Sequence, residues 1–176
     1  MTNNLKNKNT VSASITNAPI VDIFINPRSS ALPQGPTIHP TSIITLHRRQ
    51  LLCRITSGDI STLDPVTHVA IGDGGTDPLN PDTNGYPTPI MPNENMIDVF
   101  NRTALYPVTS ISYPLDPAAR TTAQYVLLIP PVQYGGRKIN EAALIDAGGL
   151  AQAIITFYDK IKDPGVALRL TFNDIF

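Results

Sequence analysis

Apolar and polar residues along the last forty positions form the patterns that are typical of β-strands. Three runs predict strands, at Lys138–Asp146, Leu150–Tyr158 and Val166–Asn173, with Gly- or Pro-containing turns between them. In the third run Val166, Leu168, Leu170 and Phe172 share one face. That period of two predicts one buried face and one face that meets water or a partner. The second run is apolar on both faces, which places it in the middle of a sheet.

Further strands are predicted upstream. Pro19–Ile25, Val66–Ile71 and Thr121–Ile129 are compact runs rich in β-branched and apolar residues. The run Leu105–Tyr113 looks extended but carries Pro107. Proline cannot donate a hydrogen bond to a sheet ladder, so this run is predicted to be an edge strand or to contain a bulge.

One helix is predicted in the N-terminal half, at about residues 42–57. Thr41 or Ser42 can cap its start after Pro40, and Gly58 fits its end. An apolar stripe at helical spacing would pack it against the sheet. The stripe consists of Ile44, Leu51, Leu52 and Ile55.

Two features of this helix have competing interpretations. His47, Arg48 and Arg49 lie partly off the stripe, either as a solvated face or as a patch for an acidic partner. Cys53 is the single cysteine, which excludes an intrachain disulfide. Because free cysteines are usually buried, we expect a buried structural thiol.

Residues 1–40 differ in character from the rest of the chain. Residues 1–18 are polar without periodicity, and 26–40 contain four prolines, which predicts an extended or disordered arm. Residues 41–176 are predicted to form a single β domain. Such arms often contact neighbouring chains. The expected contact residues are Ile20, Val21, Ile23, Phe24, Ile25, Pro33, Pro36 and Pro40.

The predicted fold class is therefore mainly β (α+β): an antiparallel sheet or sandwich with one helix and a long Pro-rich arm. Charged residues are only 15% of the chain and the net charge is −1, which gives no electrostatic case for nucleic acid or membrane partners. The N-terminus lacks the apolar core of a signal peptide, and no apolar run approaches the ~20 residues that span a bilayer. Few charges and 17 prolines suit a chain that packs against others.

Candidate chemistry is sparse. Asp73, Asp77 and Asp82, with Asn84, lie in a Gly-rich segment that could hold Ca²⁺ or simply make turns. The histidines (His39, His47 and His68) have no carboxylate or nucleophile at a motif spacing. Glu94 and Glu141 stand in unrelated segments. We therefore expect no catalytic residues, no cofactor, no metal site and no enzyme activity.

The order of elements carries a family resemblance. After the helix come Val66-Thr-His-Val-Ala-Ile-Gly-Asp-Gly-Gly75, a Pro/Asn-rich loop, Val126-Leu-Leu-Ile-Pro-Pro131 and Ile139-Asn-Glu-Ala-Ala-Leu-Ile-Asp-Ala-Gly-Gly149. This order, over residues 41–176, resembles the N-terminal tail-attachment domain of bacteriophage tail fibres and tail-collar fibre proteins. Ala143 departs from the family, which usually has Gly there, and we expect no shaft or receptor-binding tip.

The resemblance implies a free-standing baseplate or tail adaptor of a phage or of a related contractile injection machine. It implies a homo- or hetero-oligomer with other tail or baseplate proteins or a tail fibre. It also implies a virion protein made in the host cytoplasm. The likeness resides in Gly72–Gly75 and Asn140–Gly149, which are expected to build the fold more than a site. The alternative is a glycan- or receptor-binding β module. Its candidate aromatics are Tyr86, Tyr106, Tyr113 and Tyr134.

Overall fold

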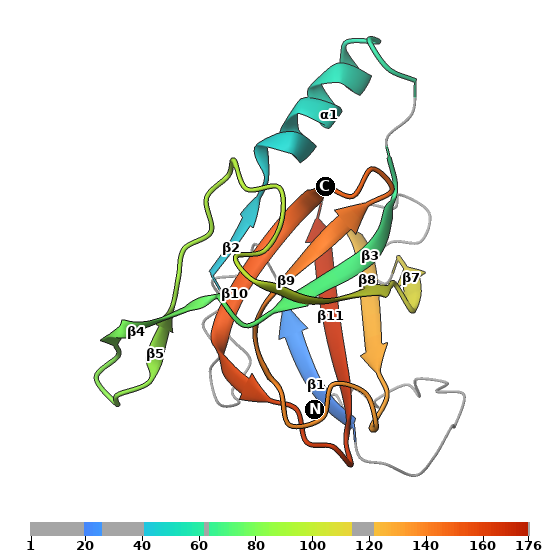
Figure 1. Cartoon of the computed structure of the whole chain (residues 1–176). Coiled ribbons are helices and arrows are strands. Elements are labelled where there is room, and N and C mark those ends of the chain that lie inside the picture. Colours follow the sequence, from blue (N-terminus) through green and yellow to red (C-terminus); the bar gives the residue numbers. More distant parts are fainter. Residues whose placement is uncertain (1–19, 26–40, 62–63, 114–121, 176) are drawn as a thin grey trace, which may run out of the picture.

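The computed structural model describes residues 20–25, 41–61, 64–113 and 122–175, which form two packed β-sheets with one helix at one end (Figure 1). The four-stranded sheet has the order β1 (Ile20–Ile25), β11 (Ala167–Ile175), β8 (Thr122–Ile129) and β7 (Ser110–Ser112). The five-stranded sheet has the order β2 (Thr41–Ile44), β10 (Ala151–Ile161), β9 (Lys138–Asp146), β3 (Val66–Gly72) and β6 (Arg102–Pro107). A hairpin is formed by β4 (Thr76–Pro81) and β5 (Pro87–Pro89), and the helix is α1 (Leu46–Thr56).

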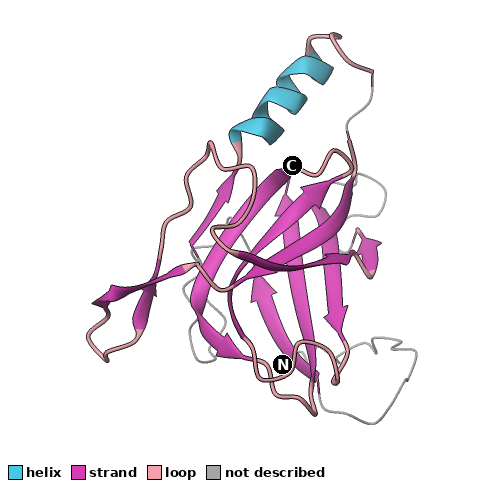
Figure 2. Ribbon diagram, viewed as in Figure 1, coloured by secondary structure: helices cyan, strands magenta, loops and turns pink. Residues whose placement is uncertain are grey.

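Strands dominate the described residues, which confirms a mainly β fold with one helix (Figure 2). The described strands pair antiparallel except for β1 with β11. The main core lies between the two sheets. Both supply large buried side chains, because alternate positions of each strand turn inward. The five-stranded sheet contributes Val69, Ile71, Leu144, Ile155 and Phe157, and the four-stranded sheet contributes Leu127, Ile129, Leu168, Leu170 and Phe172.

A second, smaller apolar cluster buries the other face of the five-stranded sheet. There Ala143 and Ile145 of β9 and Ile154 of β10 pack with Val99 and Met96, from the segment between β5 and β6. Strand β9 is therefore covered on both faces, and every residue from Ile139 to Asp146 is buried. This explains why that strand has little polar alternation in sequence.

Two positional predictions for the strands are confirmed. Strand β10 has a neighbour on each side, β2 and β9, as its two-sided apolar sequence predicted. Strand β6 lies at the edge of its sheet and ends on Pro107, where the missing N–H costs no ladder bond. The predicted run Leu105–Tyr113 is not one strand, however, because its second half forms β7 at the edge of the other sheet. The third C-terminal strand matches its prediction only in part. Leu168, Leu170 and Phe172 are buried as predicted, but Ala167 and Thr171, predicted on the exposed face, are buried as well.

The predicted start of the helix is wrong. Residues 41–44 form β2, which pairs antiparallel with β10, and the helix begins at Leu46. The buried Thr45 separates the two elements. Its hydroxyl accepts from the Arg48 amide at 3.3 Å and donates to the Ala151 carbonyl at 2.6 Å. The sheet thus competes successfully for the β-branched residues that helix periodicity had assigned to the first turn. The end is as predicted, because Gly58 follows with φ of 77°.

The expectation of a buried Cys53 is also wrong, since the thiol is exposed. The helix projects from one end of the sandwich (Figure 1), and its buried residues are Leu51 and Arg48. Cys53 therefore lies on a part of the helix that no sheet covers. Within the described ranges, no helix is both long and apolar enough to cross a membrane.

The predicted β-prone run before residue 26 does form a strand, Ile20–Ile25. It lies at the edge of the four-stranded sheet and pairs in parallel with β11. The other predicted arm contacts, Pro33, Pro36 and Pro40, lie outside the described residues, as does His39.

Candidate functional site

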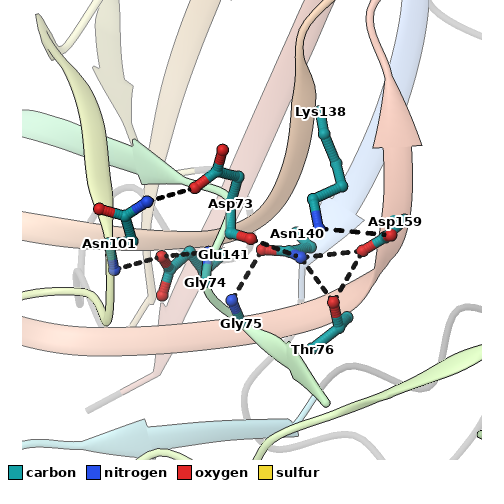
Figure 3. Close-up of polar contacts among 9 residues, drawn as sticks. All are labelled: Asp73, Gly74, Gly75, Thr76, Asn101, Lys138, Asn140, Glu141 and Asp159. Carbon is teal, nitrogen blue, oxygen red and sulfur yellow. Dashed lines mark hydrogen bonds and ion pairs between the residues drawn. The ribbon is translucent and has the colours of Figure 1, made fainter. Parts of the chain in front are cut away.

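The turn after β3, residues Gly72–Gly75, meets Asn140 and Glu141 of β9 in a network of polar contacts (Figure 3). Glu141 of β9 is fully buried and accepts three backbone N–H groups. Its Oε1 accepts from Gly74 at 3.0 Å and from Asn101 at 2.8 Å, and its Oε2 accepts from Phe100 at 2.7 Å. One carboxylate thereby joins the turn after β3 to the segment that leads into β6.

The neighbouring Asn140 extends the network from the same strand. Its Oδ1 accepts from the Gly75 amide at 2.8 Å. Its Nδ2 lies 2.7 Å from Thr76 Oγ1 and 2.8 Å from Asp159 Oδ1, and 3.1 Å from the Asp73 carbonyl. Both the donor group and the acceptor oxygen of this side-chain amide are therefore engaged within the fold. We call this set, Gly72–Thr76, Asn101, Asn140, Glu141 and Asp159, the polar clamp.

The glycines of the clamp are required by close approach. A Cβ atom at Gly72 would lie 2.3 Å from Glu141 Oε1 and 2.4 Å from the Asn101 carbonyl oxygen. A Cβ at Gly75 would lie 2.6 Å from the carbonyl oxygen of Asn140. These contacts are shorter than van der Waals separation, and the backbone atoms involved cannot rotate away. The Gly-Asp-Gly-Gly sequence therefore lets the turn lie directly on β9.

The clamp supports the β4–β5 hairpin, which projects from the side of the sandwich (Figures 1 and 2). At the base of the hairpin the Ile90 amide donates to the Gly75 carbonyl at 2.9 Å, and Thr156 of β10 donates to the Ile90 carbonyl at 2.6 Å. Further out, Leu79 is 87% exposed and Tyr86 is 63% exposed. The sequence predicts a Pro/Asn-rich loop here, and the structure shows a strand pair within it.

Two aspartates stabilise the hairpin itself. Asp77 Oδ1 accepts from the Leu79 amide at 2.9 Å, and Asp82 Oδ1 accepts from the Tyr86 amide at 2.9 Å. The side-chain hydrogen bond from Asn80 lowers the pKa of Asp77. The backbone hydrogen bond from Tyr86 lowers the pKa of Asp82. Both carboxylates thus act in turn chemistry.

The three aspartates considered for an ion do not converge. Asp73 accepts from the Asn101 side-chain amide at 2.6 Å, whereas Asp77 and Asp82 bond along the hairpin. Among the residues that the structure places, no group of three or more His, Cys, Asp or Glu side chains is arranged to hold a metal ion. The geometry therefore favours the turn interpretation of this segment.

The basic trio at the helix start is engaged within the chain. His47 Nε2 lies 2.7 Å from Asp146 Oδ2, and that aspartate is buried. Arg48 is only 4% exposed, and Arg49 forms an ion pair with Glu94. The interpretation of the trio as a solvated basic face is therefore wrong for Arg48, which is buried. The trio joins the projecting helix to the sandwich and to the 93–101 segment.

The other candidate side chains belong to several different elements and do not form one group. His68 Nδ1 contacts the hydroxyl of the adjacent Thr67 at 2.9 Å. Tyr106 and Tyr134 pack against the core, and burial raises the pKa of Tyr106. Tyr86 and Tyr113 are exposed but belong to different elements.

Sequence reasoning missed the central role of Asn140 and Glu141. The available signal was a pair of polar residues within the otherwise apolar Ile139–Ile145 run, where a buried polar pair needs partners. Comparison of the chain with protein-family models, curated proteins and solved structures finds no match. The fold is therefore a mainly β sandwich with a projecting hairpin, and the polar clamp holds the base of that hairpin.

Proposed function

We propose that this protein is a non-enzymatic structural subunit, a baseplate or tail-fibre adaptor in a phage tail or a related contractile injection machine. One observation carries the proposal. The two segments that resemble tail-attachment domains form the polar clamp, and the clamp holds a projecting hairpin with exposed apolar side chains. The proposed partners are other tail or baseplate proteins, in a homo- or hetero-oligomer within the virion tail.

The surface near the hairpin has the character of a protein contact. Five exposed side chains between residues 76 and 100 are large and apolar: Leu79, Tyr86, Met91, Ile97 and Phe100. Residues 73–101 contain Asp and Glu but no Lys or Arg. Aromatic residues and Met are enriched at interface centres. Because Asp77, Asp82 and the clamp already order this region, little conformational entropy remains to be lost on contact.

The proposal is tested by incorporation into particles. Particles are produced from a gene deletion complemented with wild type or with the double variant Leu79→Ser/Tyr86→Ser, and the protein is quantified in gradient-purified tails. We expect wild type in the tails and a loss of about tenfold or more for the variant, which corresponds to about 1.4 kcal/mol of contact energy. Val132→Ser is the matched control, because Val132 is 88% exposed on another loop.

Normal tails and infectivity without the gene would contradict a structural role. A double variant that incorporates like wild type would leave the hairpin without a contact function. Both variants must unfold at the wild-type temperature, because neither side chain of the hairpin nor Val132 is buried.

A glycan- or receptor-binding module is the second candidate, favoured by the exposure of Tyr86 on the projecting hairpin. Exposed aromatic rings can stack on apolar sugar faces. This function predicts that the purified protein binds host-surface polysaccharide and that Tyr86→Ala abolishes the binding while the protein still enters particles. Absence of binding by wild type would exclude it.

A further inference from the structure

Strand β1 is connected to the sandwich differently from every other described strand. Its pairing with β11 is the one parallel pairing among the described strands, and all other pairs are antiparallel. The register runs from Ile20 opposite Ala167 to Ile25 opposite Phe172. Parallel neighbours cannot be joined by a tight turn, so no local connection holds β1 to its own β11.

The chain that leaves β1 is long enough to reach past one domain. After Ile25 the fifteen residues 26–40 lead to Thr41, the first residue of β2 in the other sheet. At ~3.3–3.6 Å per residue they can reach about 50 Å. A compact domain of this length has a radius of gyration of about 16 Å and a diameter of about 40 Å. The same connection can therefore deliver residues 20–25 to the domain they belong to or to an adjacent one.

The position that β1 occupies must be filled by some strand. On its other side β11 pairs with β8, and its inward side chains Leu168, Leu170 and Phe172 are buried in the core. Without β1, the backbone N–H and C=O groups along that edge of β11 would be unpaired. A second copy of the chain carries an identical strand and offers the same register, so it can restore the same pairs.

We propose that residues 20–25 are exchanged between copies of this chain, with β1 of one copy pairing in parallel with β11 of the next. The occupant of the β11 edge is then a second copy, delivered by residues 26–40. Each exchange replaces a pairing within one chain by an identical pairing between two chains, which is a low-cost route to assembly.

The concentration dependence follows from the connection. Linkers of about fifteen residues hold a tethered segment at an effective concentration of about 1 mM, so exchange competes once copies approach that concentration. Neighbouring subunits of an assembled particle reach such local concentrations. This inference rests on the proposed function only because it treats residues 20–25 as contact residues. It does not depend on which particle or oligomer the copies form.

Cysteine trapping in the full chain tests the exchange. In a Cys53→Ser background, Ile20→Cys and Ala167→Cys place thiols at opposed register positions of β1 and β11. Cα atoms of adjacent strands lie within the range that a disulfide spans. The protein is refolded from denaturant at about 10 µM to about 1 mM, oxidised and separated without reductant. We expect covalent dimers or longer species to rise to about half of the product near 1 mM.

The matched control is Gln124→Cys with Asn173→Cys. These residues are opposed on β8 and β11, and their side chains lie 2.9 Å apart. Both strands belong to one sandwich, so this pair should cross-link within the chain at every concentration. Equal intermolecular product from the control would overturn the proposal, because it would show unspecific association.

Exclusively intrachain cross-linking of the 20/167 pair at all concentrations would also overturn it. A second measurement guards against misfolding of the double variant: single variants Ile20→Cys and Ala167→Cys, one of them carrying a mass tag, are mixed and refolded. Exchange predicts a heterodimer joined between positions 20 and 167, and absence of this heterodimer excludes it. If exchange fails while the hairpin variant still reduces incorporation into tails, the proposed function survives and only this inference falls.

Discussion

Glu141 offers the sharpest test of the fold, because its carboxylate is fully buried and yet holds three separate amides. In Glu141→Gln the Oε1 atom can still accept from Gly74 and Asn101. The new Nε2 group replaces the acceptor of the Phe100 amide, and two donors then face each other. A buried donor without an acceptor costs about 1–3 kcal/mol. We therefore expect Glu141→Gln to lower the free energy of unfolding by about that amount.

Glu141→Ala removes all three acceptors and leaves a cavity. Three unsatisfied buried amides would cost about 3–5 kcal/mol in total, since such penalties are rarely fully additive. A domain of this kind has about 5–15 kcal/mol of total stability. The alanine variant should thus lose a major fraction of its stability.

The assay is urea unfolding of wild type and both variants, with amide hydrogen exchange as a local measurement. In Glu141→Gln the Phe100 amide should lose protection while the Gly74 and Asn101 amides keep it. In Glu141→Ala all three should lose it. For a chain of this length, the glutamine variant should melt about 2–12 °C lower.

The matched control is Glu94→Gln. Glu94 is half exposed and its ion pair with Arg49 lies at the surface, where such pairs contribute about 0–1 kcal/mol. A Glu141→Gln variant that is as stable as this control, with unchanged exchange at Phe100, would refute the assignment of Glu141 as the acceptor that holds the 93–101 segment.

Three further predictions concern the turns and the buried lysine. Gly75→Ala should destabilise by about 1–3 kcal/mol in urea unfolding, because its Cβ meets the Asn140 carbonyl, whereas Gly165→Ala, with open space around it, should be neutral or slightly stabilising. Burial lowers the pKa of Lys162, whose Nζ donates to the Pro131 carbonyl at 2.9 Å. Between the lowered pKa and 10.5, the unfolded state therefore binds more protons than the folded state. The free energy of unfolding of wild type, relative to that of Lys162→Met, should rise with pH across that window. A difference that does not change with pH would contradict this prediction. The pKa of Asp82 is lowered, so its carboxylate should keep the hairpin ordered above pH 3.8 and lose this effect as the pH falls through the lowered pKa. Hydrogen-exchange protection of the Tyr86 amide should follow this titration in wild type but not in Asp82→Asn.

The strands of the C-terminal half were readable from sequence because their signal is local. Lys138–Asp146 has the predicted bounds, and the neighbouring strands differ from prediction by a few residues at their ends. Alternation of apolar residues and Gly or Pro at the joints depend only on adjacent positions. The edge position of Pro107 followed from its missing N–H in the same way.

The helix start and the exposure of Cys53 depended on tertiary structure. Ile43 and Ile44 suit the first turn of a helix or a short strand, and pairing with β10, more than 100 residues later, decides for the strand. That shift moves the helix toward the end of the sandwich, where Cys53 is uncovered. Local periodicity cannot report whether a sheet edge is available at a distance.

By itself, then, the sequence determined the fold class and most strands. Tertiary structure alone decided which partners the buried polar residues find. Glu141 meets Gly74 and Asn101, and His47 meets Asp146, across 40 to 99 residues of chain. Burial makes an unpaired polar group costly, so each of these side chains is held where the fold supplies its partner, and no pattern of neighbouring residues encodes which partner that is.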